Sequence, residues 1–132
     1  MMIPATYNFS VVRGSAGPSQ GLTLRLKNNT GTAEAPVLEN MDFDDVRLSI
    51  YDKPVASAAK ALIVRPTIDT GEIVVTNPGE AEVSWVPTAE DTRKLLIGPK
   101  NYYELEVRSS NDEIVYLLGV ITGIGGLNDD IE

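Results

Sequence analysis

The sequence predicts an all-β protein, an antiparallel β-sandwich of about seven to nine strands with one short helix near residues 88–96. Short runs in which apolar and polar residues alternate are separated by turns rich in glycine, proline and asparagine. With 132 residues, the chain is long enough for one hydrophobic core and too short for two. We therefore expect one sandwich domain over residues 1–126, followed by an acidic, mobile tail over residues 127–132.

The first half of the chain contains three runs with the period-2 alternation of half-buried strands. Segment 14–21 lies between the first two runs and is expected to be a loop, because its glycines and proline disfavour a strand ladder. Segment 32–40 has no stable period and is expected to be an irregular crossing. The residues that the alternation places on one face are Tyr7, Phe9 and Val11, then Leu22, Leu24 and Leu26, then Val46, Leu48 and Ile50.

The second half contains five further strand-like runs. The only tryptophan of the chain, Trp85, alternates with polar neighbours and is expected in or at the rim of the core. Segment 114–124 is apolar at nearly every position, so we expect both of its faces to be covered. The expected strands cover residues 62–64, 73–75, 80–86, 102–108 and 114–124.

The segment before the last two strands carries the signals of a helix start. Thr88 and Asp91 fit the Ser/Thr-x-x-Asp/Glu capping pattern, with acidic residues in the first turn and basic residues in the last. A helical turn ahead of Tyr102 and Tyr103 is typical of a corner in immunoglobulin-like sandwiches, where a tyrosine hydrogen-bonds back across the corner. The predicted architecture is therefore immunoglobulin-like, without the cysteine pair of antibody domains.

The charge and the missing residue types exclude most functional classes. A net charge of -8 disfavours DNA and RNA as partners, because their binding depends on lysine and arginine. The chain has no cysteine and no histidine, so we predict no catalytic residue, no cofactor and no metal site. Glu104 and Glu106 share one face of a strand, but they alternate with apolar residues as the solvated face of a sheet does. We expect neither an enzyme nor a small-molecule substrate.

The start of the sequence lacks the basic and apolar regions of a signal peptide. No run approaches the roughly 18 apolar residues that a membrane span needs. We therefore expect no signal peptide and no membrane as a partner.

Three regions are candidate interfaces with other proteins. The first is the outward face of segment 114–124. In an alternative interpretation of equal weight, the loop 14–21 of the same chain covers that face. The second is that glycine-rich loop, and the third is segment 32–41. The residues that we place at these interfaces are Val115, Leu117 and Ile121, then Gly17 and Pro18, then Val37 and Leu38.

A second hypothesis belongs to another functional class, a small carbohydrate-binding sandwich. Aromatic side chains can stack on sugar rings, and four residues, Tyr51, Trp85, Tyr102 and Tyr116, are candidates for such a platform. Aromatic residues make up only 6% of the chain, which disfavours a broad platform.

Several segments in a fixed order resemble small virion proteins of tailed bacteriophages and prophages. They share a helical turn at 88–92 and a glycine after the first strand. The N-terminal β-sandwich domain of baseplate upper proteins is the family member that the chain resembles. The segments that carry the resemblance are 7–14, 22–26, 41–48, Tyr102-Tyr103-Glu104-Leu105-Glu106-Val107 and Leu117-Leu118-Gly119-Val120.

The resemblance implies a structural virion component in the tail, baseplate or neck, or a decoration of the capsid. Its partners would be other virion proteins and further copies of the same chain, and no reaction is implied. Such a protein is made in the cytoplasm of the bacterial host and ends up in the virion. Residues 1–132 carry no long C-terminal extension with a host-binding head, so we do not expect a receptor-binding role.

Overall fold

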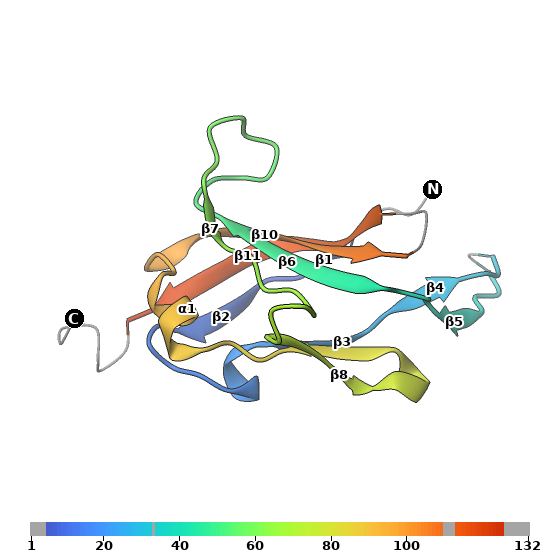
Figure 1. The fold of residues 1–132 in the computed structure, drawn as a ribbon. Helices are drawn as coiled ribbons and strands as arrows, with labels where there is room; N and C mark the ends of the chain where they lie inside the picture. The colour runs from blue at the N-terminus through green and yellow to red at the C-terminus, as the bar shows by residue number, and fades with distance from the viewer. Residues whose placement is uncertain (1–4, 33, 110–112, 126–132) are drawn as a thin grey trace.

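The computed structural model describes residues 5–32, 34–109 and 113–125, and about half of these residues lie in β-strands. Figure 1 shows two layers of strands that face each other, with one short helix at one end. A mostly β fold with one short helix is thus confirmed. The predicted tail, residues 127–132, lies outside the described residues.

The described residues form eleven strands, one α-helix and two 3-10 turns. The strands are β1 (Ala5–Thr6), β2 (Phe9–Val12), β3 (Leu22–Arg25), β4 (Lys27–Asn29), β5 (Leu38–Asn40), β6 (Asp45–Tyr51), β7 (Leu62–Val64), β8 (Ile73–Asn77), β9 (Glu82–Trp85), β10 (Gly98–Arg108) and β11 (Glu113–Ile124). The α-helix is α1 (Ala89–Arg93), and the 3-10 turns are η1 (Pro18–Gln20) and η2 (Pro78–Glu80).

Within the described residues the strands form three sheets. The largest has the order β1-β11-β10-β6-β7, with β2 also paired to β11. The second has the order β3-β9-β8, and β4 and β5 form a two-stranded sheet. The expectation of purely antiparallel pairing is wrong for the N-terminal strands, because β1 and β2 run parallel to β11. Parallel neighbours need a long connection, and here nearly the whole chain lies between them.

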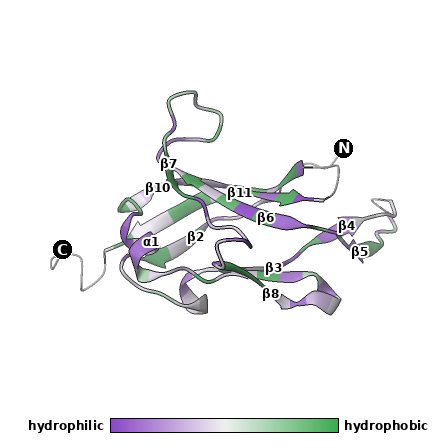
Figure 2. Cartoon of the chain, viewed as in Figure 1, coloured by the Kyte–Doolittle hydropathy of each residue, from purple (hydrophilic) through white to green (hydrophobic). Residues whose placement is uncertain are grey.

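The core lies between the six-stranded and the three-stranded sheets, and hydrophobic residues are found in both layers (Figure 2). Phe9 packs edge-on against Trp85 of one sheet and Tyr103 of the other, with ring centroids 6.4 and 5.6 Å apart. The prediction that Trp85 lies in the core is confirmed. Fully buried side chains include Val46, Leu48, Ile50, Tyr103 and Leu105 from the larger sheet and Ile73, Val83 and Trp85 from the smaller one.

The described residues contain eleven strands, more than the expected seven to nine. Strand β1 lies just before the first expected strand, which begins at Tyr7, and the second expected strand is divided into β3 and β4. Between β1 and β2, the Asn8 side chain accepts the Val120 N–H through Oδ1 at 2.9 Å and takes the place of a backbone acceptor. Between β3 and β4, Leu26 turns its fully buried side chain into the core. The third additional strand, β5, forms in the segment that we expected to be irregular, where it pairs with β4.

The helix begins as the sequence predicts. The Thr88 hydroxyl accepts the Asp91 N–H at 3.1 Å, so the predicted N-cap is confirmed. The expected tyrosine is not the residue that ties the following corner. Asn101 does this instead, because its Oδ1 accepts Leu96 N–H at 2.8 Å and its Nδ2 donates to the carbonyls of Leu96 and Ile121, both at 2.9 Å.

Candidate functional site

The most exposed apolar side chains of the described residues include two on a hairpin. We call β4, β5 and the described residues between them the arm. The side chain of Leu38 is 66% exposed and that of Val37 is 51% exposed. The arm projects past the ends of the two main sheets (Figure 1). Apolar side chains that protrude in this way can be buried only against another molecule.

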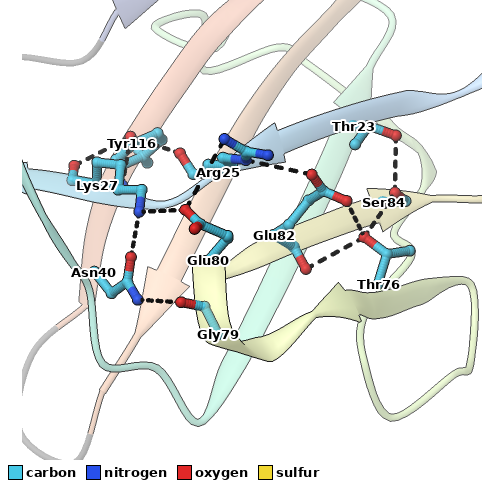
Figure 3. Close-up of polar contacts among 10 residues, drawn as sticks. All are labelled: Thr23, Arg25, Lys27, Asn40, Thr76, Gly79, Glu80, Glu82, Ser84 and Tyr116. Carbon is cyan, nitrogen blue, oxygen red and sulfur yellow. Dashed lines mark hydrogen bonds and ion pairs between the residues drawn. The ribbon is translucent and has the colours of Figure 1, made fainter.

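Polar contacts hold the base of the arm (Figure 3). The Lys27 ammonium bonds the Asn40 side chain across the hairpin and pairs with the Glu80 carboxylate at 3.2 Å. Asn40 donates in turn to the Gly79 carbonyl at 2.9 Å. Glu80 and Gly79 belong to the turn between β8 and β9, so these contacts tie the arm to the three-stranded sheet. This network was not predictable from the sequence, because Lys27 and Glu80 are 53 residues apart.

A tyrosine ties the arm to the opposite sheet as well. The Tyr116 hydroxyl from β11 accepts the Lys27 N–H at 3.0 Å and lies 3.1 Å from the Lys27 carbonyl and 3.3 Å from that of Arg25. The arm is therefore attached to both sheets at its base. Such attachment fixes the direction in which the arm projects.

The far part of the arm is closed by its own hydrogen bonds. Thr30 N–H donates to the Val37 carbonyl at 2.9 Å, and Thr32 N–H donates to the Ala35 carbonyl at 3.2 Å. The Thr32 hydroxyl also accepts the Ala35 N–H at 3.0 Å. Val37 and Leu38 thus sit on an ordered hairpin, and their exposure does not come from an open coil.

A cavity lies beside the arm. It has a volume of about 410 Å³ and lies between the base of the arm and the ends of β10 and β11. Met41, Val107 and Ile114 give it an apolar part, and Asn40 and Asp42 give it polar groups. Asn40 lines this cavity and lies on β5, two residues from Leu38. A partner that covers Leu38 can therefore also reach into the cavity.

The structure corrects the proposed interface on the last strand. The side chain of Leu117 is 7% exposed and that of Ile121 is fully buried, so both belong to the core of the chain. Val115 is the exception, because it is half-buried and lies opposite Glu106 on the outer face. The register of β10 and β11 shifts between Leu105 and Glu106. This irregularity moves Leu117 from the expected outer face to the inner one.

The glycine-rich loop is attached to the body of the protein. Gly17 has a φ of 102°, a conformation that favours glycine, and its N–H donates to the Pro87 carbonyl at 3.1 Å. Pro18 begins the turn η1, and Gln20 at its end accepts the Val12 N–H at 2.9 Å. The loop therefore lies against α1 and β2 and does not project as the arm does.

The four candidate stacking aromatics do not form an exposed platform. The side chain of Trp85 is 2% exposed and lies in the core, and Tyr116 is turned towards the arm. Tyr51 and Tyr102 are cross-strand neighbours on the outer face of the larger sheet. Tyr51 is nevertheless buried, because the Lys60 ammonium lies 4.9 Å from the centre of its ring. Of the four candidates only Tyr102 and Tyr116 are partly exposed, and they do not form a common platform, because Tyr116 bonds the arm through its hydroxyl.

The outer face of the larger sheet carries a row of acidic residues. Burial is the main cause that raises the pKa of Glu106, and a hydrogen bond with Glu113 and the charge of Glu104 raise it further. Arg47 and Arg108 lie 3.9 and 3.5 Å from the Glu113 carboxylate. The arrangement is a solvated network of charges, and within the described residues no group of three or more acidic side chains is placed to hold a metal ion.

Two neighbouring acidic residues, Glu72 and Asp91, make the stability of the protein depend on pH. Burial, followed by a hydrogen bond with Asp91 and its charge, raises the pKa of Glu72 from 4.5 to about 7. One oxygen, Oε2, is buried without a hydrogen-bond partner among the described residues. The folded state thus favours the protonated form of Glu72. This contribution to stability is complete below pH 4.5 and is lost as the pH rises through 7.

Glu72→Gln should therefore stabilise the protein at pH 8 and have little effect at pH 4.5. Because Glu72 is only partly buried and solvent screens its charge, we expect a gain of about 1 kcal/mol at pH 8. Urea unfolding of the parent and the variant at both pH values measures it, with Glu39→Gln on the arm as the control for net charge. Equal differences at the two pH values would contradict the role given to Glu72.

The sequence matches no protein-family model, and a search of curated proteins gives no match. In the part of the chain that the structure describes, no helix is long and apolar enough to cross a membrane.

Proposed function

We propose that the chain is a structural component of the virion of a tailed bacteriophage and acts through protein-protein contacts. The observation that carries the proposal is the arm, an ordered hairpin with Val37 and Leu38 exposed at 51% and 66%. The proposed location is the virion, after synthesis in the cytoplasm of the bacterial host. The proposed partners are other virion proteins and further copies of the chain, without nucleic acid, membrane or small-molecule substrate.

The framework that we propose is an immunoglobulin-like β-sandwich. The strand order supports it, because β3-β9-β8 corresponds to strands B-E-D and β11-β10-β6 to strands G-F-C of that fold. The helix α1 occupies the connection between the strands that correspond to E and F. Sandwiches of this type hold projecting loops in fixed positions, which suits a protein that makes contacts and performs no chemistry.

The energetics of the arm favour binding to a protein. Full burial of an exposed valine or leucine side chain contributes about 1.5–3 kcal/mol, so Val37 and Leu38, which are 51% and 66% exposed, together offer roughly 2–3 kcal/mol at a contact. The contacts of Lys27 and Asn40 already fix the arm before binding. An element that is ordered in advance loses less conformational entropy when it binds. The net charge of -8 further favours partners with basic surfaces.

Complementation in trans tests the proposal. A phage that lacks the gene should be rescued by a plasmid copy of the parent chain and of Leu62→Asp, a change of an exposed leucine on β7. Leu38→Asp should lower the yield of complete particles at least tenfold, because an aspartate cannot be buried unpaired at a contact. All three chains should have similar unfolding free energies. Full rescue by Leu38→Asp would contradict the role of the arm.

A further inference from the structure

The strand β8 forms one edge of the three-stranded sheet and pairs only with β9 among the described residues. We propose that β8 pairs antiparallel with β8 of a second copy across a two-fold axis. The two sheets then form one continuous sheet of six strands. This inference builds on the proposed assembly function and names one partner, a second copy of this chain. The start of β8 is coloured as hydrophobic in Figure 2.

The backbone groups of Ile73 and Val75 point to this edge, where the Ile73 N–H is already bonded within the chain and the groups of Val75 are open among the described residues. The Glu72 carbonyl points towards β9, because it accepts the N–H of Val86, the residue after β9, at 2.8 Å. The N–H of the next residue, Ile73, points to the other side, where it donates to the Thr67 carbonyl at 3.2 Å. In an antiparallel ladder, successive residues direct these groups to opposite sides. The N–H and C=O of Val75 therefore point to the free edge, in the same direction as those of Ile73.

The apolar side chains of β8 can cover those of β8 in a second copy. Val75 lies opposite Val83 and on the core side of the sheet, yet its side chain is 40% exposed because no strand follows. With Val75 on the two-fold axis, each Val75 donates to and accepts from its counterpart, and the two valines cover each other. Val74, 37% exposed on the outer face, then lies opposite Thr76 of the second copy.

Charge also favours a second copy at this edge. A chain with a net charge of -8 repels its own copies, so a contact between copies needs an uncharged surface. All five residues of β8 are uncharged. A two-fold contact places β8 of each copy opposite β8 of the other, so the two facing strands are both uncharged and do not repel each other.

The other sheet edges are protected from such pairing. Strand β3 carries a charged residue, Arg25. Strand β7 is followed by Arg65 and Pro66, and β1 has only two residues. Charge, proline and short length are devices that keep edge strands apart. The five residues of β8 include no charged residue and no proline, and Glu72 and Pro78 lie just outside the strand. The irregularity of β8 falls after Val75, so the residues up to Val75 remain regular.

Light scattering across a concentration series tests the pairing. The parent chain should pass reversibly from 14.3 kDa to twice this mass as its concentration rises. Val75→Pro removes an N–H that points away from β9, so it should keep the fold and abolish the dimer. Leu62→Lys, on the exposed position of β7, should dimerise like the parent. A parent chain that stays monomeric up to millimolar concentration would overturn the proposal, as would a dimer unaffected by Val75→Pro.

A cysteine variant gives an independent measurement if the proline disturbs the fold. The chain contains no cysteine, so Val75→Cys introduces a single thiol, which a short bis-maleimide should cross-link in the dimer. Ser57→Cys, in the loop between β6 and β7, should remain uncross-linked, and equal cross-linking of both would overturn the proposal. Failure here is distinct from failure of the proposed function. A monomeric chain that enters particles contradicts only the pairing, and a dimer absent from particles contradicts only the virion role.

Discussion

Asn101→Ala should remove about 3–5 kcal/mol of the unfolding free energy, a large part of the 5–15 kcal/mol typical of small proteins. The Asn101 side chain is fully buried and makes three hydrogen bonds, two to Leu96 and one to the Ile121 carbonyl. Alanine would leave the Ile121 carbonyl without this partner in a buried position and would release the corner after α1. Chemical denaturation of the parent and the variant measures the difference.

The matched control is Asn77→Ala. Asn77 is exposed at the end of β8, and its side chain makes no capping hydrogen bond. Its replacement should change the unfolding free energy by less than about 0.5 kcal/mol. Equal effects of the two substitutions would show that Asn101 does not hold the corner.

Leu117→Asp should unfold the protein. The side chain of Leu117 is 7% exposed within the core, and an unpaired carboxylate there costs more than about 4 kcal/mol. Val115→Lys, two residues earlier, should leave the protein folded, because Val115 lies on the outer face opposite Glu106. Circular dichroism and thermal melting measure both variants. A folded Leu117→Asp variant with the melting temperature of the parent would place Leu117 on the surface after all.

The strands with a clear alternation could be predicted from the sequence. Val46, Leu48 and Ile50 are separated by polar residues, and all three are fully buried as expected. The helix start was equally clear, because Thr88 and Asp91 interact within one turn and need no distant partner. Local patterns were sufficient wherever the structure depends on neighbours in the sequence.

The last strand shows why local patterns fail elsewhere. Segment 114–124 is apolar on both faces, so its sequence does not mark which residues point inward. The shift between Leu105 and Glu106 then reverses the expected faces, which placed Leu117 and Ile121 on the wrong side. A one-residue irregularity of this kind has no sequence signature in a run without polar residues.

The arm could be predicted only in part. Val37 and Leu38 were expected at an interface, and the structure places both on the surface. What fixes the arm was not predictable, because Lys27 meets Glu80 and Tyr116 only after the sheets have assembled. Contacts between residues 53 and 89 positions apart depend on the complete fold.

The central claim is that this chain is a component of a virion, and the composition of purified particles tests it most directly. Particles of the phage that we propose as the source of the chain can be purified on a density gradient and analysed by quantitative mass spectrometry. We expect the chain in the particle fraction, in a fixed ratio to the other structural proteins. A chain found only in the soluble fraction of the lysate, with none in particles, would contradict the account.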